Sequence, residues 1–161
     1  LAQYPQLLDA TQYFKFGHKF VTFIIEFIDE YHHSKEESVL FLALSEPGVL
    51  VHCNPVNQML VEHQMAKHAF EQISAAIEKR DLDASAYAID SYALVLNQHI
   101  YKEDSILYPM AVQSISEENQ CRIFEQYSKI ERSRQKETLW ERYLYFSEEL
   151  DIILSSRPAP T

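Results

Sequence analysis

One ten-residue pattern occurs twice in this chain, and it restricts the fold more than any other feature. Residues 32–41 read HHSKEESVLF, and residues 99–108 read HIYKEDSILY. Aligned on the shared Lys-Glu pair, the two copies match at a His, a Lys, a Glu, an acidic residue, a Ser, a β-branched residue, a Leu and an aromatic residue. His32 therefore corresponds to His99, and Glu36 corresponds to Glu103.

In each copy the His and the Glu are four residues apart, which places both side chains on one face of a helix, one turn apart. The residues one turn further along are apolar in both copies. An imidazole and a carboxylate thus sit on a stripe that is otherwise suited to burial. Because burying a charge is costly unless it is paired or binds a metal, the pattern indicates a metal site inside a helical core.

The length and the glycine content favour a helical fold. A chain of 161 residues suits one domain with a sizeable core. Only two glycines occur, Gly17 and Gly48, and alternation of β-branched residues is rare. We expect an all-α single domain over residues 1–161, with metal-binding helices at 10–112 and C-terminal helices at 114–155.

The charge pattern excludes several classes of partner. The chain has 14 basic and 24 acidic residues, a net charge of −10, and no basic patch, so neither nucleic acid nor an anionic membrane is expected as a partner. The longest apolar run, residues 20–28, is too short to span a membrane. Two isolated cysteines, Cys53 and Cys121, and the lack of a signal-peptide pattern predict a cytoplasmic location.

Helical periodicity joined by short loops predicts an antiparallel, up-and-down bundle. Asn54 and Asp83 are suitable N-caps for the second and third long helices. Two capping boxes, at 114–117 and 138–141, predict two further helices near the C-terminus. The three long helices are expected at about 11–44, 54–80 and 83–110.

His63 is the only polar residue on the apolar stripe of the second long helix. It lies about as many residues from the end of that helix as His99 lies from the start of the next. At a rise of about 1.5 Å per residue, antiparallel helices therefore bring the two imidazoles to one height along the bundle axis. The same count places His32 within about one helical turn of that height. Three imidazoles and two carboxylates at one level predict a site for a first-row metal, and carboxylates on opposite helices can bridge two ions. The predicted ligands are His32, Glu36, His63, His99 and Glu103.

The other histidines are interpreted differently. His33 is rotated by about 100° from His32 on an α-helix, so it is expected to lie behind the ligands rather than to bind the metal. His68 is expected at the surface. His18 precedes His32 by 14 residues, which is about 21 Å along one helix, so it is not expected to reach the site unless the chain breaks at Gly17.

These motifs resemble the hemerythrin-like family, also called HHE cation-binding domains. The matching pieces are HHSKEE at 32–37, Glu62-His63 with Ala66-Lys67, and HIYKED at 99–104. The resemblance, over roughly residues 11–150, implies a four-helix bundle with a non-haem di-iron centre. Such a centre binds O₂, NO or another small ligand, or senses iron or redox state. It also implies that the three histidines named above are terminal ligands and that the two glutamates bridge the ions.

Two positions differ from the family pattern. Lys67 stands where circulating hemerythrins have a second His, and no suitable His precedes the first motif. Fewer protein ligands imply more positions for water or exogenous ligands. The missing ligand is expected from a helix upstream of Leu1, from solvent or from a neighbouring chain. If no such helix covers the bundle, its apolar face favours a homodimer.

Two alternative functions fit the sequence less well. A ferritin-like di-iron oxidase would need two Glu-x-x-His motifs, whereas Leu60 and Leu96 stand three residues before His63 and His99. A helical interaction module with a structural metal, such as zinc, would favour four closed ligands that include Cys. Because no nucleophile–base pair is evident either, we expect a protein that binds a metal and a small ligand rather than an enzyme.

Overall fold

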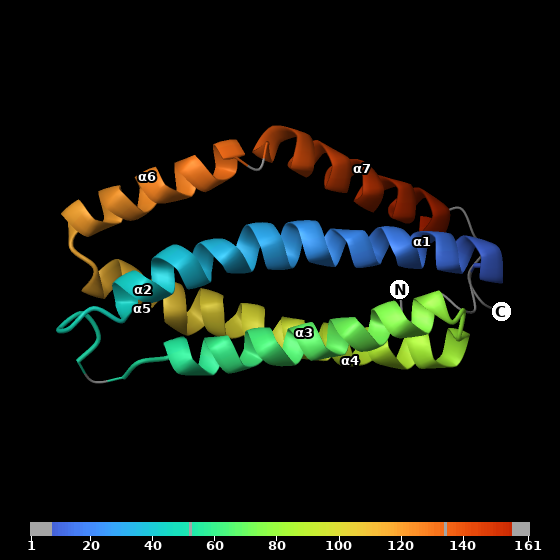
Figure 1. Cartoon of the computed structure of the whole chain (residues 1–161), viewed down its shortest axis with the longest axis horizontal. Coiled ribbons are helices and arrows are strands. Elements are labelled where there is room, and N and C mark those ends of the chain that lie inside the picture. The colour runs from blue at the N-terminus through green and yellow to red at the C-terminus, as the bar shows by residue number, and fades with distance from the viewer. Residues whose placement is uncertain (1–7, 52, 134, 156–161) are drawn as a thin grey trace.

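In the computed structural model, residues 8–51, 53–133 and 135–155 are described, and helices are the only regular elements among them. The predicted all-α class is confirmed. Figure 1 shows one long helix in the middle, with α3 and α4 on one side of it and α6 and α7 on the other. The bounds of the helices named here are α3 (Val56–Glu78), α4 (Leu82–Lys102), α6 (Glu117–Ser133) and α7 (Lys136–Ser155).

The middle helix continues without interruption through the first copy of the repeat. Asp9 caps its N-terminus, because its carboxylate accepts a hydrogen bond from the backbone N–H of Gln12 at 2.9 Å. The chain stays helical through Gly17, so the break that would fold His18 back does not occur, and His18 is exposed. Four consecutive segments make up this helix: α1 (Ala10–Phe23), η2 (Ile24–His33), η3 (Glu36–Leu40) and α2 (Phe41–Leu44).

Helices α3 and α4 form an antiparallel pair whose ends are fixed by side-chain caps. The Asn54 side chain accepts a hydrogen bond from the backbone N–H of Val56 at 2.9 Å, as expected. At the start of α4 the prediction of Asp83 as the N-cap is wrong, because Asp81, two residues earlier, is the N-cap. Asp81 is extended, and its carboxylate accepts from the backbone N–H of Ala84 at 3.0 Å, because Arg80 adopts a left-handed conformation that redirects the chain.

The last part of the chain also begins its helices at positions other than those predicted. Helix α4 continues through η4 (Glu103–Leu107) into α5 (Tyr108–Ser114), which includes the residue expected to start the first capping box. Ser116 takes that role, since its hydroxyl accepts from the backbone N–H of Asn119 at 3.3 Å. Helix α7 begins two residues before Thr138. Both differences are shifts of a helix start, and both predicted helices exist.

The sequence repeat has a counterpart in the backbone. Glu36 begins the five-residue segment η3, and Glu103 begins the five-residue segment η4. Both segments are π-helical, with more residues per turn than an α-helix, and such turns are common at functional sites. The longer π-helical segment η2 ends at His33, so the histidine pair of the first copy does not follow α-helical phase.

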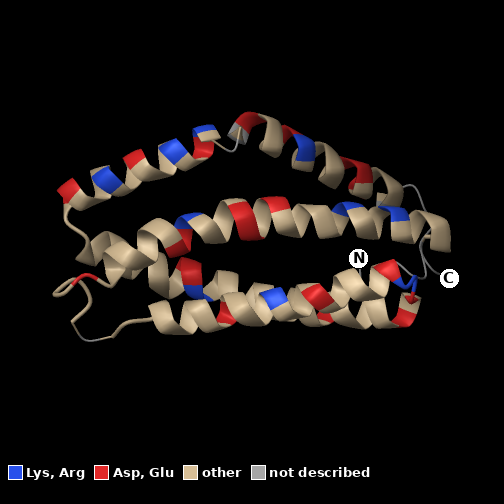
Figure 2. Ribbon diagram, in the orientation of Figure 1, with Lys and Arg blue, Asp and Glu red and all other residues tan. Residues whose placement is uncertain are grey.

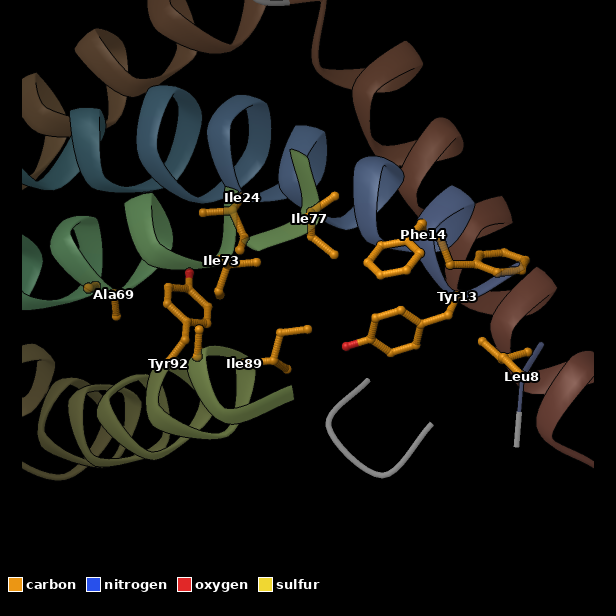
Figure 3. Packing of buried hydrophobic residues seen from close by; sticks show 12 residues of the cluster. Leu8, Tyr13, Phe14, Ile24, Ala69, Ile73, Ile77, Ile89 and Tyr92 are labelled. Carbon is orange, nitrogen blue, oxygen red and sulfur yellow. The ribbon is translucent and has the colours of Figure 1, made fainter. Parts of the chain in front are cut away.

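The main core lies between the middle helix and the α3–α4 pair. Figure 3 shows Tyr13 and Phe14 of α1 facing the isoleucines of α3 and α4, with Tyr92 standing on α4. On the opposite face aromatic rings join η2 to α7, where the rings of Phe27 and Trp140 lie 5.0 Å apart. The middle helix is therefore covered on both sides, which fixes the position of its metal-binding motif.

Most charged residues lie on the outer surfaces of the helices. Figure 2 shows Lys and Arg interspersed with Asp and Glu along the longer helices, most regularly on α6. Within the described residues, no helix combines the length and the apolar character needed to cross a lipid bilayer.

The contact between α1 and α3 at Gly17 yields a test of the core. A Cβ at this position would overlap the Cδ1 atom of Ile77, which is fully buried. We expect Gly17→Ala to lower stability by about 1 kcal/mol, because a crowding cost of about 1–3 kcal/mol exceeds the helix-propensity gain of about 1 kcal/mol.

The matched background is Ile77→Val, which removes the obstructing methyl group. In that background the same Gly17→Ala change is expected to raise the free energy of unfolding by about 1 kcal/mol, because only the propensity gain remains. Urea unfolding of the four proteins measures both steps. An equal loss in both backgrounds would show that the close approach of the two helices is not what excludes a side chain.

Candidate metal centre

Four polar side chains from three helices meet inside the bundle. Glu36 comes from η3, His63 from α3, His99 from α4 and Glu103 from η4. Each residue is no more than 4% exposed, and each offers one ligand atom that lies within 4.8 Å of the others. The structure therefore brings four of the five predicted residues into one buried cluster.

Each carboxylate in this cluster lies beside one imidazole. His63 Nε2 is 3.3 Å from a carboxylate oxygen of Glu36, and His99 Nε2 is 3.1 Å from one of Glu103. The two imidazole rings are 4.8 Å apart between centroids, at the common height expected from counting residues. Two His–Glu pairs thus face each other across the bundle.

The fifth predicted residue, His32, lies at the edge of this cluster. Its Nε2 atom is 3.9 Å from Glu36 and 3.7 Å from Glu103, so it approaches both carboxylates. Its side chain is 35% exposed, unlike those of the other four. His32 therefore closes the cluster on the solvent side.

His33 lies inside the cluster, although α-helical spacing placed it behind the ligands. It is 4% exposed, and its ring stacks on that of His63 with 3.9 Å between centroids. His33, His63 and His99 form a second group of potential ligands. The difference arises because the π-helical segment η2 rotates its last residues relative to an α-helix, which a count based on 3.6 residues per turn does not include.

Two carboxylates behind the histidines orient their rings. Glu37 lies 2.6 Å from His63 Nδ1, and Glu62 lies 3.2 Å from His99 Nδ1. Each Nδ1–H can donate to its carboxylate, which leaves Nε2 to face the cluster; this arrangement is common around metal-bound histidines. Glu62 is held in turn by Lys102 and Gln58.

Spacing did not identify either of these outer carboxylates. Each stands next to a predicted ligand in the sequence, since Glu37 follows Glu36 and Glu62 precedes His63. Both also fall within the pieces that resemble the family, but spacing along one helix does not give their roles, because the contacts that they make cross from one helix to another.

Tyr108 supports one carboxylate only. Its hydroxyl donates to one oxygen of Glu36 at 2.7 Å, while the other oxygen faces His63. Tyr108 occupies the aromatic position of the repeat, which is Phe41 in the first copy. The Phe41 ring lies 5.5 Å from that of His63, so the aromatic residues of both copies contact the same half of the cluster.

The protonation of these groups depends on their burial and on one another. Burial, followed by the neighbouring His63, lowers the pKa of His33 to about 3, which keeps its imidazole neutral. Burial alone would raise the pKa of Glu103, but the adjacent imidazoles of His32 and His99 outweigh it and lower that pKa. Burial would lower the pKa of His99, and the adjacent carboxylate of Glu103 raises it instead. A neutral imidazole and an ionised carboxylate are the forms that bind metals.

Whether these residues fit a metal can be judged from their unpaired atoms. A buried polar atom without a partner costs roughly 1–3 kcal/mol. Among the described residues, no hydrogen-bond partner is present for Glu36 Oε2, His63 Nε2, His99 Nε2 and Glu103 Oε1. A cation placed between these four atoms would be contacted by all of them at once, so the cluster fits a bound metal.

A helical bundle with a buried cluster of histidines and carboxylates defines a cation-binding protein. A family model described as the hemerythrin HHE cation-binding domain matches residues 1–111, and the chain belongs to that family. No curated protein matches this chain, and no solved structure matches it. Helices α6 and α7 follow the matched region.

The lowered pKa of His33 gives a prediction about pH. Its folded-state pKa of about 3 lies below the unfolded value of about 6.5, so the unfolded chain binds more protons between these values. Metal-free protein should therefore lose stability as the pH falls from about 6.5, by up to about 1.4 kcal/mol per pH unit from this residue.

The measurement is urea unfolding of the chelated protein at pH 7.0 and pH 5.5. We expect His33→Gln to lose less stability between these pH values than the parent does. His68→Gln, which changes a histidine with a 73% exposed side chain, should behave like the parent. If both variants change with pH as the parent does, His33 is not held neutral by its surroundings.

Proposed function

We propose that this protein is a non-haem di-iron protein that binds or senses a small ligand such as O₂ or NO. The observation that carries the proposal is the pair of His–Glu contacts, His63 with Glu36 and His99 with Glu103. Among the described residues, the atoms that face each other in these contacts have no hydrogen-bond partner. Membership of a cation-binding family supports the same conclusion.

The arrangement supports two ions rather than one. Each carboxylate has its own imidazole: that of Glu36 is on the neighbouring helix α3, and that of Glu103 lies one turn earlier on its own helix. His32 approaches both carboxylates from the edge. Carboxylates that project from opposite helices can each contact two ions, as in other helical-bundle sites. The ligand set of nitrogen and oxygen atoms without sulfur favours first-row metals such as iron.

The protein residues supply geometry and exclude water. Glu37 and Glu62 fix the imidazoles of His63 and His99, and Tyr108 fixes Glu36, so the ligand atoms are oriented before anything binds. Bound ferrous iron would supply the electrons that O₂ or NO accepts. Three of the four histidines around the cluster, His33, His63 and His99, are buried, which restricts access to molecules of a few atoms.

Metal analysis tests the proposal directly. Protein purified without oxygen and reconstituted with ferrous iron should contain two irons per chain, and its optical spectrum should change on exposure to air. Chelation should lower the melting temperature, because a ligand of the native state at a hundredfold excess over its Kd stabilises by about 2.7 kcal/mol. Protein that holds no iron after reconstitution would contradict the proposal.

Loss of a bridging carboxylate should release both ions. We expect Glu36→Ala and Glu103→Ala each to lower the iron content from two per chain to near zero, because each carboxylate would contact both ions. The control is Glu37→Ala, which removes the adjacent carboxylate behind His63. It should weaken iron binding by about 10- to 100-fold and still reach two irons at saturation. A Glu36→Ala or Glu103→Ala variant that keeps two irons would show that its carboxylate is not a bridge.

A further inference from the structure

His33 is buried at a position where the second copy of the repeat has an exposed residue. That residue is Ile100, which is 43% exposed, whereas His33 is 4% exposed. The π-helical segment η2 ends at His33, and the imidazole lies against the rings of His63 and His99. The first copy therefore brings into the interior an imidazole that the second copy lacks.

The three buried imidazoles are in mutual contact. The ring of His33 lies 3.9 Å from that of His63 and 5.8 Å from that of His99, measured between centroids. Each of the three residues offers one ligand atom, and these atoms lie within 4.8 Å of one another. A metal–nitrogen bond is roughly 2.1 Å long, so ligands on opposite sides of one ion are about 4 Å apart. Small side-chain shifts are therefore enough for all three rings to share an ion.

The same nitrogen atom is available on each ring. Among the described residues, no hydrogen-bond partner is present for Nε2 of His33, His63 or His99. A carboxylate oxygen of Asp29 lies 3.9 Å from His33 Nδ1, so the nearby acidic group is on the Nδ1 side of the ring, as it is for the other two. A histidine that only filled the core would leave Nε2 without water or a partner, which is unfavourable. A cation would use that atom.

The remaining histidine of the cluster is placed differently. The side chain of His32 is 35% exposed, and its Nε2 atom is 3.9 Å from Glu36 and 3.7 Å from Glu103. Its ring lies 5.5 Å from that of the adjacent His33. The histidines thus divide into a buried group of three and a single one at the solvent edge.

We propose that His33 is a metal ligand, which joins His63 and His99 in binding one cation through their Nε2 atoms. His32 binds the second cation, and the two carboxylates contact both. The inference rests on the proposed function, because it divides the ligands of that centre between its two ions. Imidazole nitrogen is a favourable ligand for first-row metals such as iron, so the ion with three imidazoles is bound more tightly and fills first.

The first experiment adds cobalt(II) stepwise to metal-free protein and follows its optical spectrum, since cobalt is next to iron in the first-row series. We expect a tight step and a weaker step in the parent. Loss of a group behind a ligand already weakens metal binding by about 10- to 100-fold, so His33→Gln should weaken the tight step by at least about 100-fold. His68→Gln changes an exposed histidine and should bind cobalt(II) as the parent does.

The second experiment counts the imidazoles on the first ion in the parent itself. A paramagnetic ion strongly shifts the proton resonance of the ring N–H of each imidazole that binds it. With one equivalent of cobalt(II), the parent should show three shifted N–H resonances that disappear after exchange into deuterated water. His33→Gln should lose one of them, and His68→Gln should keep all three. Because the count is made on the parent, it is decisive even if His33→Gln fails to fold.

Two outcomes would overturn the inference and leave the proposed function standing. One is a parent that binds two metal ions but shows only two shifted resonances with one equivalent of cobalt(II). The other is a folded His33→Gln protein whose tight step is unchanged. A parent that binds neither cobalt(II) nor iron is a different result, because it contradicts the proposed function itself.

Discussion

The fold depends on how the interior accommodates two carboxylates. Glu36 and Glu103 are almost completely buried, and removal of two such charges from water is opposed by several kilocalories per mole each unless other charges replace the lost hydration. Nearby imidazoles meet part of that need, as the raised pKa of His99 shows. The three helices that provide these side chains are consequently held in one register, because any slip by a turn would leave a buried charge alone.

Residues outside the cluster extend this constraint through the bundle. Glu62 contacts His99 and is itself contacted by Lys102, so two further charged groups stand behind this imidazole. On the other side, Lys35 and Tyr31 both contact Glu131 of α6. The C-terminal helices, which lie after the region matched by the family model, are thereby connected to the segment that carries the first motif. The layers are joined by polar contacts at the level of the cluster and by aromatic contacts elsewhere.

Most of the cluster could be predicted from the sequence because its positions follow regular geometry. The heights of His63 and His99 were obtained by counting, since α3 and α4 are α-helices with a constant rise. The orientation of His33 could not be obtained in this way, because it depends on a π-helical segment, and no residue in the sequence predicts that segment. The partners of Glu37 and Tyr108 lie on other helices, and the reach of a side chain between helices is not encoded in spacing along one of them.

The aromatic position of the repeat removes the symmetry that the duplicated motif would otherwise give. Phe41 and Tyr108 come from different copies, yet the ring of one lies near His63 and the hydroxyl of the other is bonded to Glu36. The His99–Glu103 half is instead supported by acidic and basic groups through Glu62. The carboxylate of Glu36 is thus held by a neutral phenol, whereas the imidazole of His99 is held by a carboxylate that is itself paired with Lys102. The two halves of the cluster would therefore not contribute equally to holding a cation.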